Sequence, residues 1–366
     1  MFTQTKSAQA KTLSLRDRVL RSPLVDLLTG PHGVDRYTEL VEPTWTLGDS
    51  RAKVVAVRRQ TPRSVTLTLE PNAAFAAGPA LRAGQHVNLT VEVNGRRQTR
   101  CYSPANAEGD RLLELTIGVH DEGLVSQHLF HNARPGMVVG LDGLSGDFTL
   151  PAVRPRSVLF VSGGSGITPV LSMLRTLTSE SDRSRSDREI TFIHYARTPE
   201  EACYRAELAA MSGIRVLYGY SRSPEAGDLT GYFGPEHLAD MPAPDAVFAC
   251  GPPPLVEAVR AQFPGAKFES FVPPVFAVPT EVSGGTVAFA DSGVDVTDDG
   301  RSLLEQAEAA GLSPESGCRM GICHTCTRRK TSGAVKNLIT GAVSTADEED
   351  VQICVSVPVG DVELSL

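Results

Sequence analysis

The sequence predicts a multidomain protein in which an antiparallel β-barrel, an α/β domain with a parallel sheet and a small cysteine-bearing domain follow one another. Three observations lead to this prediction. Short β-branched runs between turn residues come first, strands that alternate with helical segments follow, and four regularly spaced cysteines lie near the end. With 366 residues, the chain has room for several domains that each bury a core.

Residues 1–50 are predicted to form a helical extension, because leucine and valine recur at helical spacing between residues 15 and 28. Arg16, Arg18 and Arg21 would form a basic face that can touch an anionic membrane surface. The alternative is an appendage that packs on the next domain.

Residues 51–153 are predicted to form the barrel. The runs KVVAVRRQ, SVTLTLEP, HVNLTVEV, LLELTIGV and MVVGLDG are short and rich in β-branched residues. Between two of the strands, Asn94-Gly95 is the signature of a type I′ hairpin turn.

Residues 154–272 are predicted to form the α/β domain. SVLFVS and EITFIHYA are continuous apolar strands, each followed by a helical segment, and RVLYGYS and AVFACG continue the pattern. Residues 273–283 are rich in proline and valine, end before a glycine pair and read as a linker, so that residues 284–366 form the third domain.

The four cysteines of the third domain have the spacing C-x4-C-x2-C…C, which is typical of plant-type 2Fe–2S proteins. Gly317 and Gly321 give the backbone freedom that a tight loop around a cluster needs. A four-cysteine zinc site is the alternative, but such sites usually pair two C-x2-C units. The predicted metal ligands are Cys318, Cys323, Cys326 and Cys354.

The barrel carries the motif R-x-Y-S at Arg100, Tyr102 and Ser103. An arginine binds a phosphate, a tyrosine offers a flat face to a ring, and a serine hydroxyl reaches a ring nitrogen. A flavin nucleotide needs all three contacts. Further along, Gly123 and Ser126 open a helix and offer a seat for a phosphate.

The α/β domain carries a glycine-rich turn between its first strand and helix. Gly163, Gly164 and Gly166 let the backbone approach a pyrophosphate, Thr168 is expected to cap the helix, and Pro169 fits its first position. The helix N-terminus then faces the anion.

Two further sites lie at strand ends of this domain. Cys250 and Gly251 end a strand at the carboxyl edge, where α/β folds bind ligands, although a buried core thiol is the alternative for Cys250. Arg197 and the pair Ser221-Arg222 suit the 2′-phosphate of NADPH, because an arginine fork with a hydroxyl binds a dianion. We therefore expect NADPH, with NADH as the alternative and a solvated loop charge as the other explanation of Arg222.

In this order, over residues 51–366, the motifs resemble the ferredoxin–NADP reductase superfamily, and specifically its iron–sulfur flavoproteins. The resemblance implies a flavin barrel, a nicotinamide domain and an α+β ferredoxin-like (β-grasp) domain. It implies that Arg100 binds the flavin phosphate, Tyr102 packs on the isoalloxazine and Ser103 approaches its N5 atom. It also implies that Cys318 and Cys323 hold one iron while Cys326 and Cys354 hold the other.

The remaining site residues follow from the same resemblance. The flavin site would be completed by Ile117, Val119, Gly123, Val125 and Ser126. The dinucleotide would be seated by Gly163, Gly164, Gly166 and Thr168, with Cys250 and Gly251 beside the nicotinamide. Glu269 and Phe271 would lie at the domain junction and, with Ser103 and Cys250, are the candidate catalytic residues. We expect FAD, with FMN as the alternative because His120 stands near a place where the family often has a basic residue.

The expected function is electron transfer from NADPH through FAD and the 2Fe–2S cluster to a protein acceptor. The segment DRYTELVEPTW resembles reductases that serve membrane di-iron fatty-acid desaturases and hydroxylases. The alternative acceptors are a Rieske oxygenase or a haem-thiolate monooxygenase. A free-flavin reductase would need no cluster, and a non-enzymatic redox sensor would need no nicotinamide motif.

The distribution of charge and the use of cysteine limit the classes of partner and the cellular compartment that we expect. Residues 284–366 hold thirteen acids and six bases, so we expect a protein partner and no nucleic acid. The run Arg328, Arg329 and Lys330, with Arg319, is a candidate docking patch, and a solvated run that balances local acidity is the alternative. Cys101, Cys203 and Cys250 show no disulfide pattern, and the sequence has no apolar run long enough to span a membrane. We expect a cytoplasmic monomer, peripheral at a membrane only through its acceptor.

Overall fold

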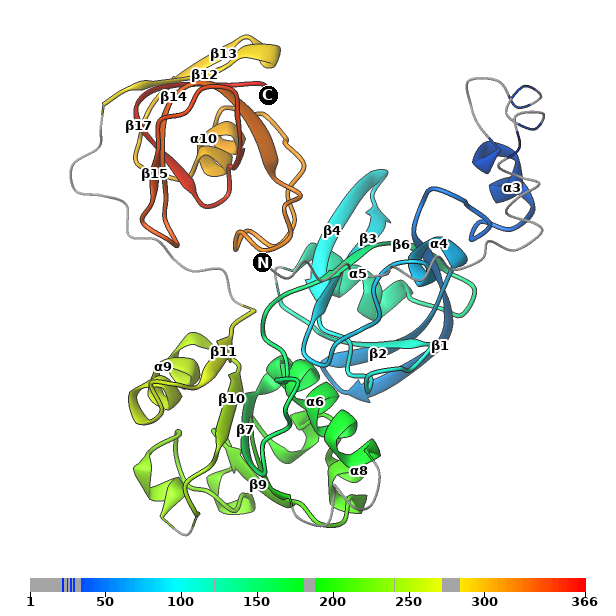
Figure 1. Ribbon diagram of the computed structural model, residues 1–366, viewed down its shortest axis with the longest axis vertical. Coiled ribbons are helices and arrows are strands. Elements are labelled where there is room, and N and C mark those ends of the chain that lie inside the picture. Colours follow the sequence, from blue (N-terminus) through cyan, green and yellow to red (C-terminus); the bar gives the residue numbers. More distant parts are fainter. Residues whose placement is uncertain are drawn as a thin grey trace, which may run out of the picture.

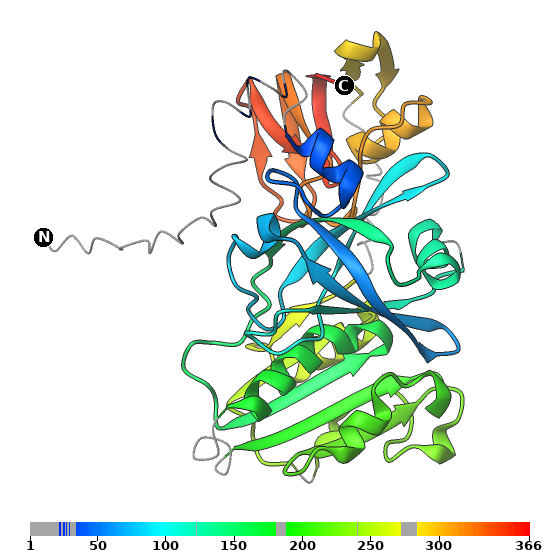
Figure 2. The ribbon, with the colours of Figure 1, turned by 90° about the vertical axis from the view of Figure 1, so that its right-hand side faces the viewer.

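The computed structural model describes residues 34–121, 123–180, 188–239, 241–271 and 284–366, together with residues 22, 25, 27 and 29. These residues form three domains. Figures 1 and 2 show the blue-to-cyan barrel between the green α/β domain and the yellow-to-red domain of residues 284–366. The predicted multidomain class is confirmed. Most of the predicted N-terminal helical extension and the predicted linker lie outside the described residues.

Within residues 1–50 the structure describes one complete helix, α3 (Asp35–Val41). Glu39 of this helix pairs with Arg51, the first residue of the barrel, at 2.9 Å. Helix α3 is therefore attached to the barrel, whereas the choice between a membrane-contacting helix and a packed appendage for residues 15–28 falls almost wholly outside the described residues. Among the described residues, no helix is both long and apolar enough to cross a bilayer.

Six antiparallel strands form the barrel in the order β4-β3-β6-β1-β2-β5. Inward-facing residues such as Leu67 and Leu89 are fully buried in one apolar cluster. The β3–β4 turn has positive φ at both Asn94 (52°) and Gly95 (75°), so the predicted type I′ turn is confirmed. The elements are β1 (Arg51–Thr61), β2 (Ser64–Pro71), α4 (Ala73–Ala76), β3 (His86–Val93), β4 (Arg96–Tyr102), β5 (Leu113–Gly118), α5 (Leu124–Asn132) and β6 (Val138–Ser145).

Five parallel strands form the second sheet in the order β11-β10-β7-β8-β9. Both faces are covered: Phe160 packs in one apolar cluster, and its neighbours Leu159 and Val161 pack in another. Burial on both faces explains why these strands read as continuous apolar runs. The elements are β7 (Ser157–Gly163), α6 (Ile167–Ser179), β8 (Glu189–Ala196), α8 (Arg205–Ala210), β9 (Arg215–Tyr220), β10 (Ala246–Cys250), α9 (Pro253–Gln262) and β11 (Lys267–Glu269), with the 3-10 turn η2 (Gly164–Gly166) between β7 and α6.

The barrel and the parallel-sheet domain share an apolar core and a charged network. Phe148 of the barrel packs edge-on against Phe248 of β10, with ring centroids 6.0 Å apart. Arg175 of α6 binds Glu114 of β5 at 3.1 Å, and the Tyr204 hydroxyl donates to the same carboxylate at 2.9 Å. These contacts fix the two domains against each other.

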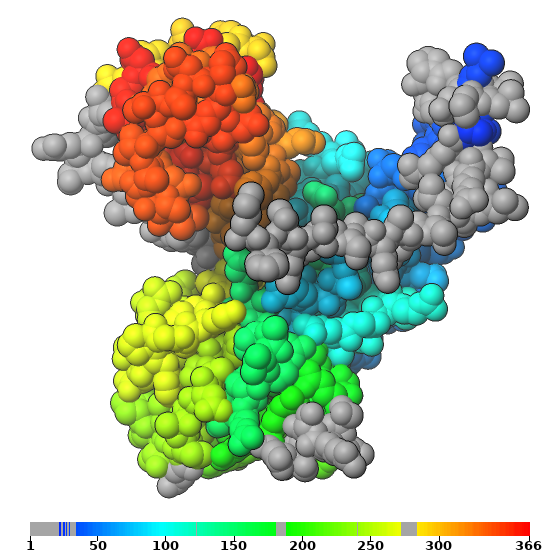
Figure 3. Space-filling view, in the orientation of Figure 1, coloured from blue at the N-terminus to red at the C-terminus, as the bar shows by residue number. Residues whose placement is uncertain are grey.

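The third domain is a mixed sheet in the order β13-β12-β17-β14-β15 with one helix packed on it. The helix begins with a capping box in which Ser302 and Glu305 bond each other's backbone amides. Its apolar core is separate from those of the other domains, and Figure 3 shows it as a lobe of its own. The elements are β12 (Thr286–Phe289), β13 (Val294–Thr297), α10 (Leu303–Ala309), β14 (Thr327–Asn337), β15 (Val343–Ser344), β16 (Glu349–Gln352) and β17 (Ser356–Leu364).

Candidate functional site

The four predicted cluster ligands are buried and lie in two pairs. The backbone amide of Cys318 donates to the Cys323 sulfur at 3.2 Å, and that of Met320 donates to the Cys318 sulfur at 3.3 Å. In the second pair, a hydrogen bond from the Cys354 thiol lowers the pKa of Cys326 to about 7 and raises the pKa of Cys354. The backbone amides that donate to the sulfurs of the first pair favour thiolates, which are the form that binds iron.

The loop before the second cysteine depends on two glycines. A Cβ on Gly317 would lie 2.6 Å from the Cys323 sulfur, so any side chain there would occupy the cluster site. Gly321 has a φ of +74°, and its carbonyl accepts a bond from Gln352 at 2.7 Å. The buried set of four thiols with amide donors fits a 2Fe–2S cluster.

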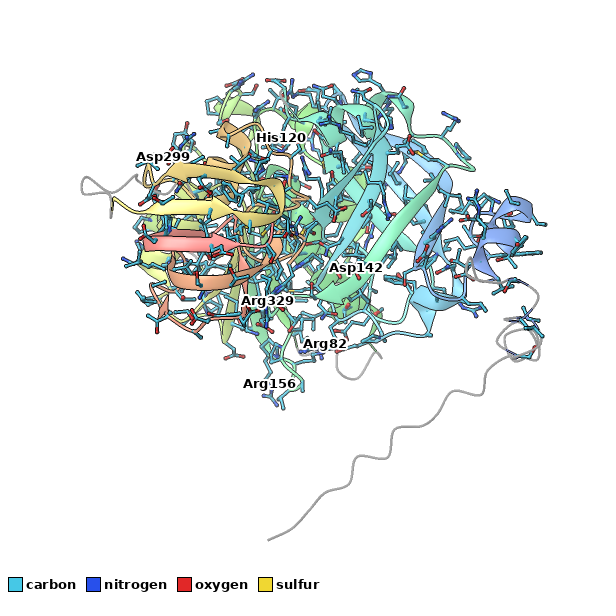
Figure 4. All side chains as sticks on the ribbon, turned by 90° about the horizontal axis from the view of Figure 1, so that it is seen from above. Arg82, His120, Asp142, Arg156, Asp299 and Arg329 are labelled. Carbon is cyan, nitrogen blue, oxygen red and sulfur yellow. The ribbon has the colours of Figure 1, made fainter. Side chains whose placement is uncertain are left out.

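The basic run beside the cluster loop does not form the expected docking patch. Lys330 is fully buried, and its ammonium group donates to the Gly333 carbonyl at 2.8 Å and to the Ala346 carbonyl. Arg329 is exposed but pairs with Glu348 at 3.1 Å. The expectation that included Lys330 is therefore wrong, because alternation along β14 turns this side chain inward. Figure 4 labels Arg329 on this domain, well apart from Asp299.

The flavin motif ends strand β4. Ser103 is 2% exposed, and its hydroxyl oxygen has no hydrogen-bond partner among the described residues. The Arg100 guanidinium donates to the Thr99 carbonyl at 2.8 Å, while Tyr102 packs against the barrel core. A buried hydroxyl without a partner is costly unless a bound group satisfies it, so the motif fits a flavin.

Glu269 and a histidine that sequence analysis missed lie together at the domain junction. The carboxylate of Glu269 is 3.9 Å from Nδ1 of His86, and Oε2 of Glu269 has no hydrogen-bond partner among the described residues. Burial raises the pKa of Glu269 to about 8 and lowers that of His86. The other nitrogen of His86 bonds the Ser145 hydroxyl at 2.9 Å. No motif marks His86 in the sequence, because it comes there only through the pairing of β3 with β6.

The glycine-rich turn packs directly against the end of strand β10. A Cβ on Gly166 would lie 2.3 Å from the Cys250 carbonyl, and one on Gly163 would lie 2.8 Å from Pro252. Helix α6 begins at Ile167 with Gly166 at its N-cap, whereas Thr168 donates its hydroxyl to the Ser165 carbonyl at 3.2 Å. The expectation that Thr168 caps the helix is therefore wrong.

Cys250 is fully buried, and burial raises its pKa well above the usual value. The thiol is therefore neutral and lies within electrostatic reach of Glu269. Gly251 follows at the carboxyl end of the strand, with its amide 3.4 Å from the Glu269 carbonyl.

A cavity of about 490 Å³ opens between the barrel and the parallel-sheet domain. Eight predicted residues line it: Val119, Gly163, Gly164, Gly166, Arg197, Ser221, Gly251 and Phe271. Sequence analysis missed others from the barrel's first hairpin, from the end of strand β8 and from a loop of the parallel-sheet domain: Thr61, Arg63, Ser64, Tyr195, Tyr232 and Phe233. The T-P-R-S turn of that hairpin was the signal that could have found the first three.

The other predicted residues do not line the cavity. Ile117 and Val125 are buried in the barrel core. Ser126 donates its hydroxyl to the Gly123 carbonyl at 3.1 Å at the start of α5. Arg222 is exposed beside Ser221, and its amide donates to the Arg197 carbonyl at 2.8 Å.

Family profiles match all three domains. Residues 72–150 match the oxidoreductase FAD-binding domain, residues 160–261 the oxidoreductase NAD-binding domain, and residues 288–359 the 2Fe–2S iron–sulfur cluster binding domain. An NADPH oxidoreductase of Mycobacterium tuberculosis is 33% identical over 93% of this chain and 90% of its own length. The chain belongs to the ferredoxin–NADP reductase superfamily, in the branch with a C-terminal 2Fe–2S domain.

Other members serve oxygenases. The glycine betaine monooxygenase reductase subunit of Chromohalobacter salexigens is 26% identical over 88% of this chain and 96% of its own length. The solved phthalate dioxygenase reductase superposes with a TM-score of 0.58 at 25% identity, over 86% of this chain and 97% of that one. As a member of this superfamily, the chain is an NAD(P)H oxidoreductase that uses FAD and a 2Fe–2S cluster, an electron-transfer reductase of the kind that serves oxygenase systems.

Proposed function

We propose that this reductase takes electrons from NADPH and delivers them, through FAD and the 2Fe–2S cluster, to a separate iron protein that activates oxygen. The observation that supports this most is the arrangement of the three domains, with the barrel in contact with both the dinucleotide cavity and the cluster loop. A bound flavin supplies the conversion of a two-electron donation into single-electron steps.

The residues of the chain would bind and orient the cofactors. Arg100 binds the flavin phosphate, Tyr102 packs on the ring and Ser103 donates the hydrogen bond that its buried hydroxyl lacks. The turn at Gly163, Gly164 and Gly166, with Thr168 behind it, seats the pyrophosphate of the dinucleotide. The flavin site is completed by Ile117, Val119, Gly123, Val125 and Ser126.

Three groups would surround the nicotinamide. Glu269 stays protonated near neutral pH, because its pKa is about 8, so it presents a neutral carboxyl. Cys250 presents a neutral thiol, with Gly251 beside it, and Phe271 covers the cavity from the domain junction. A neutral, buried setting favours hydride transfer because it excludes water and opposing charge.

The cluster would be held by Cys318, Cys323, Cys326 and Cys354.

The choice of NADPH rests on Arg197, Ser221 and Arg222, which meet at the ends of β8 and β9. We predict that Arg222→Ala raises KM for NADPH about ten- to hundredfold but changes KM for NADH little, since only NADPH carries the extra phosphate. Steady-state kinetics with ferricyanide as acceptor would measure both values. An equal effect on the two cofactors, or a wild type that prefers NADH, would contradict the choice.

The acceptor is the finer part of the proposal. The resemblance of DRYTELVEPTW favours a di-iron fatty-acid desaturase or hydroxylase, and the names of the relatives favour an oxygenase, with a Rieske oxygenase as the second candidate. Reconstitution of the reductase with each class of acceptor, with NADPH-dependent product formation as the readout, would decide between them. Activity with neither class would overturn the assignment of the acceptor but leave the NADPH and cluster assignments standing.

A further inference from the structure

A fifth thiol lies at the cluster site. The sulfur atoms of Cys101, Cys318 and Cys323 all lie within 4.8 Å of one another. Cys101 belongs to strand β4 of the barrel, whereas the other two belong to the cluster loop of the third domain. Cys101 is the variable position of the R-x-Y-S motif, and neither the flavin contacts nor the four-cysteine ligand set uses it.

The position of Cys101 on the strand explains why it faces the cluster loop. Side chains alternate along β4, so Cys101 points away from the side of Arg100 and Tyr102. Asn88 is directly opposite it on β3, and the Cys101 sulfur is 3.0 Å from Oδ1 of Asn88. The amide nitrogen of Asn88 donates in turn to the Cys323 carbonyl at 3.3 Å. Asn88 is 6% exposed, so one buried side chain holds both the thiol and the loop.

We propose that the Cys101 thiol donates its hydrogen to the sulfurs of Cys318 and Cys323 when these hold iron, and so ties the flavin-binding strand to that end of the cluster. The inference rests on the ligand set of the proposed function. A thiol has one hydrogen, which turns about the C–S bond without moving the sulfur. A charged thiolate is a stronger acceptor than the amide carbonyl of Asn88, so ligation redirects the hydrogen.

This contact would set the reduction potential of the cluster. A donor to cluster sulfur stabilises the reduced state, which carries the extra negative charge, and hydrogen bonds to the sulfurs are among the factors that tune such clusters. The expected size is that of one hydrogen bond, about three- to tenfold in the equilibrium constant for reduction. For a one-electron couple, tenfold corresponds to about 59 mV.

The test is a redox titration of the holoprotein, followed by EPR of the reduced cluster. We expect Cys101→Ala to lower the potential by this amount and to alter the EPR signal, because its g-values respond to charge at the sulfurs. Cys101→Ser keeps a donor and is expected to stay close to the wild type. Cys101→Val, which fills the space of the thiol with methyl groups that donate no hydrogen bond, takes the place of the alanine variant if the smaller residue prevents cluster loading.

Thr99→Val is the matched control. Thr99 is two residues away on the same face of β4, and its hydroxyl bonds that of Thr90 at 2.7 Å. The variant therefore removes a hydrogen bond between the same two strands without touching the thiol group, and we expect the potential to be unchanged.

Three outcomes test the inference and its basis separately. Wild-type potentials in both Cys101→Ala and Cys101→Val would overturn it, since the hydrogen would then stay on Asn88. A Cys354→Ser protein that kept a normal cluster would instead overturn the ligand set of the proposed function. A shift in Thr99→Val as large as in Cys101→Ala would assign the effect to the strand pair and would also overturn the inference.

Discussion

Glycine at position 166 is required by a backbone-to-backbone contact. The carbonyl of Cys250 occupies the place where a Cβ would stand, at 2.3 Å, and neither partner is a flexible side chain. The contact brings the turn that we propose seats the pyrophosphate against the strand end that we propose lies beside the nicotinamide. One missing methyl group thus sets the spacing between two parts of the cavity.

We predict that Gly166→Ala destabilises the protein by at least about 2 kcal/mol and weakens dinucleotide binding, because the two backbones must separate. Thermal unfolding and titration with the oxidised nucleotide would measure the two effects. Gly265→Ala is the control in the same domain, since a Cβ there meets nothing within 4 Å. Equal effects of the two substitutions would show that the close contact does not matter.

Glu269 predicts a pH dependence of stability. Its pKa rises from an ordinary 4.5 to about 8 on folding, because the carboxyl is buried. Between these two values the unfolded chain has lost a proton that the folded chain keeps, so stability falls as pH rises, by about 1.4 kcal/mol per pH unit at most.

In Glu269→Gln this dependence should disappear. We expect the Tm of flavin-free wild type to fall more steeply than that of the variant from about pH 5 to about pH 8. Calorimetric scans of both proteins across this range are the measurement. Parallel curves would mean that the carboxyl is ionised when folded.

At the level of elements, strand β14 shows how a basic run divides between structure and surface. Lys330 lies within the domain and its ammonium group satisfies two carbonyls, whereas Arg329 is exposed in ion pairs with Glu348 and Asp350. These two adjacent cations therefore have different roles.

We predict that Lys330→Met costs the third domain about 3 kcal/mol, because methionine has no hydrogen to donate and leaves the buried carbonyls without their donor. Arg329→Met is the matched control and should unfold with the wild type, since exposed ion pairs contribute little. The loss of the cluster's visible absorption during a denaturant titration would report the unfolding of the third domain. Similar midpoints for the two variants would contradict the structural role of Lys330.

Most of the strands and one of the turns could be predicted from the sequence. The strands of both sheets follow from their period and apolar runs, and the β3–β4 turn follows from Asn94-Gly95. The helical segment expected after the strand EITFIHYA is only the short helix α8, because Tyr204 takes a φ of 60° and carries its hydroxyl to the barrel. That contact joins residues far apart in the chain, and no local pattern encodes it.

The site divides in the same way. Motifs that bind through backbone, such as the glycine turn, and the cysteine spacing were visible in the sequence. His86, Asn88 and the approach of Cys101 to the cluster loop were not, since they arise where strands pair and domains meet.

At the level of the whole molecule, the cluster domain has its own apolar core, while the barrel and the parallel-sheet domain have one apolar cluster in common. Loss of the cluster should therefore leave the rest of the reductase intact. We predict that Cys354→Ser lacks the iron–sulfur absorption but keeps its flavin and most of its NADPH–ferricyanide activity. Cys354 is the better choice than Cys323, beside which Cys101 offers a replacement thiol.

Visible spectra and iron content, with ferricyanide and acceptor assays in parallel, provide the measurement. Electron delivery to the acceptor should be lost while ferricyanide reduction continues. Loss of both activities together would show that the cluster domain is needed to hold the flavin site.

The order of the three domains along the chain differs from their order in space. Along the chain the domains run barrel, nicotinamide domain, cluster domain, but in space the barrel is central (Figures 1 and 2). The contacts that position the cluster loop, such as that from Asn88 to Cys323, belong to the folded surfaces and not to the peptide connection. A rearranged gene that encodes residues 284–366 ahead of residue 51, with a connection of sufficient reach, would preserve every neighbour relation that the electrons use. Gene fusion and shuffling can thus reorder these domains along the chain while the contacts between their folded surfaces stay the same.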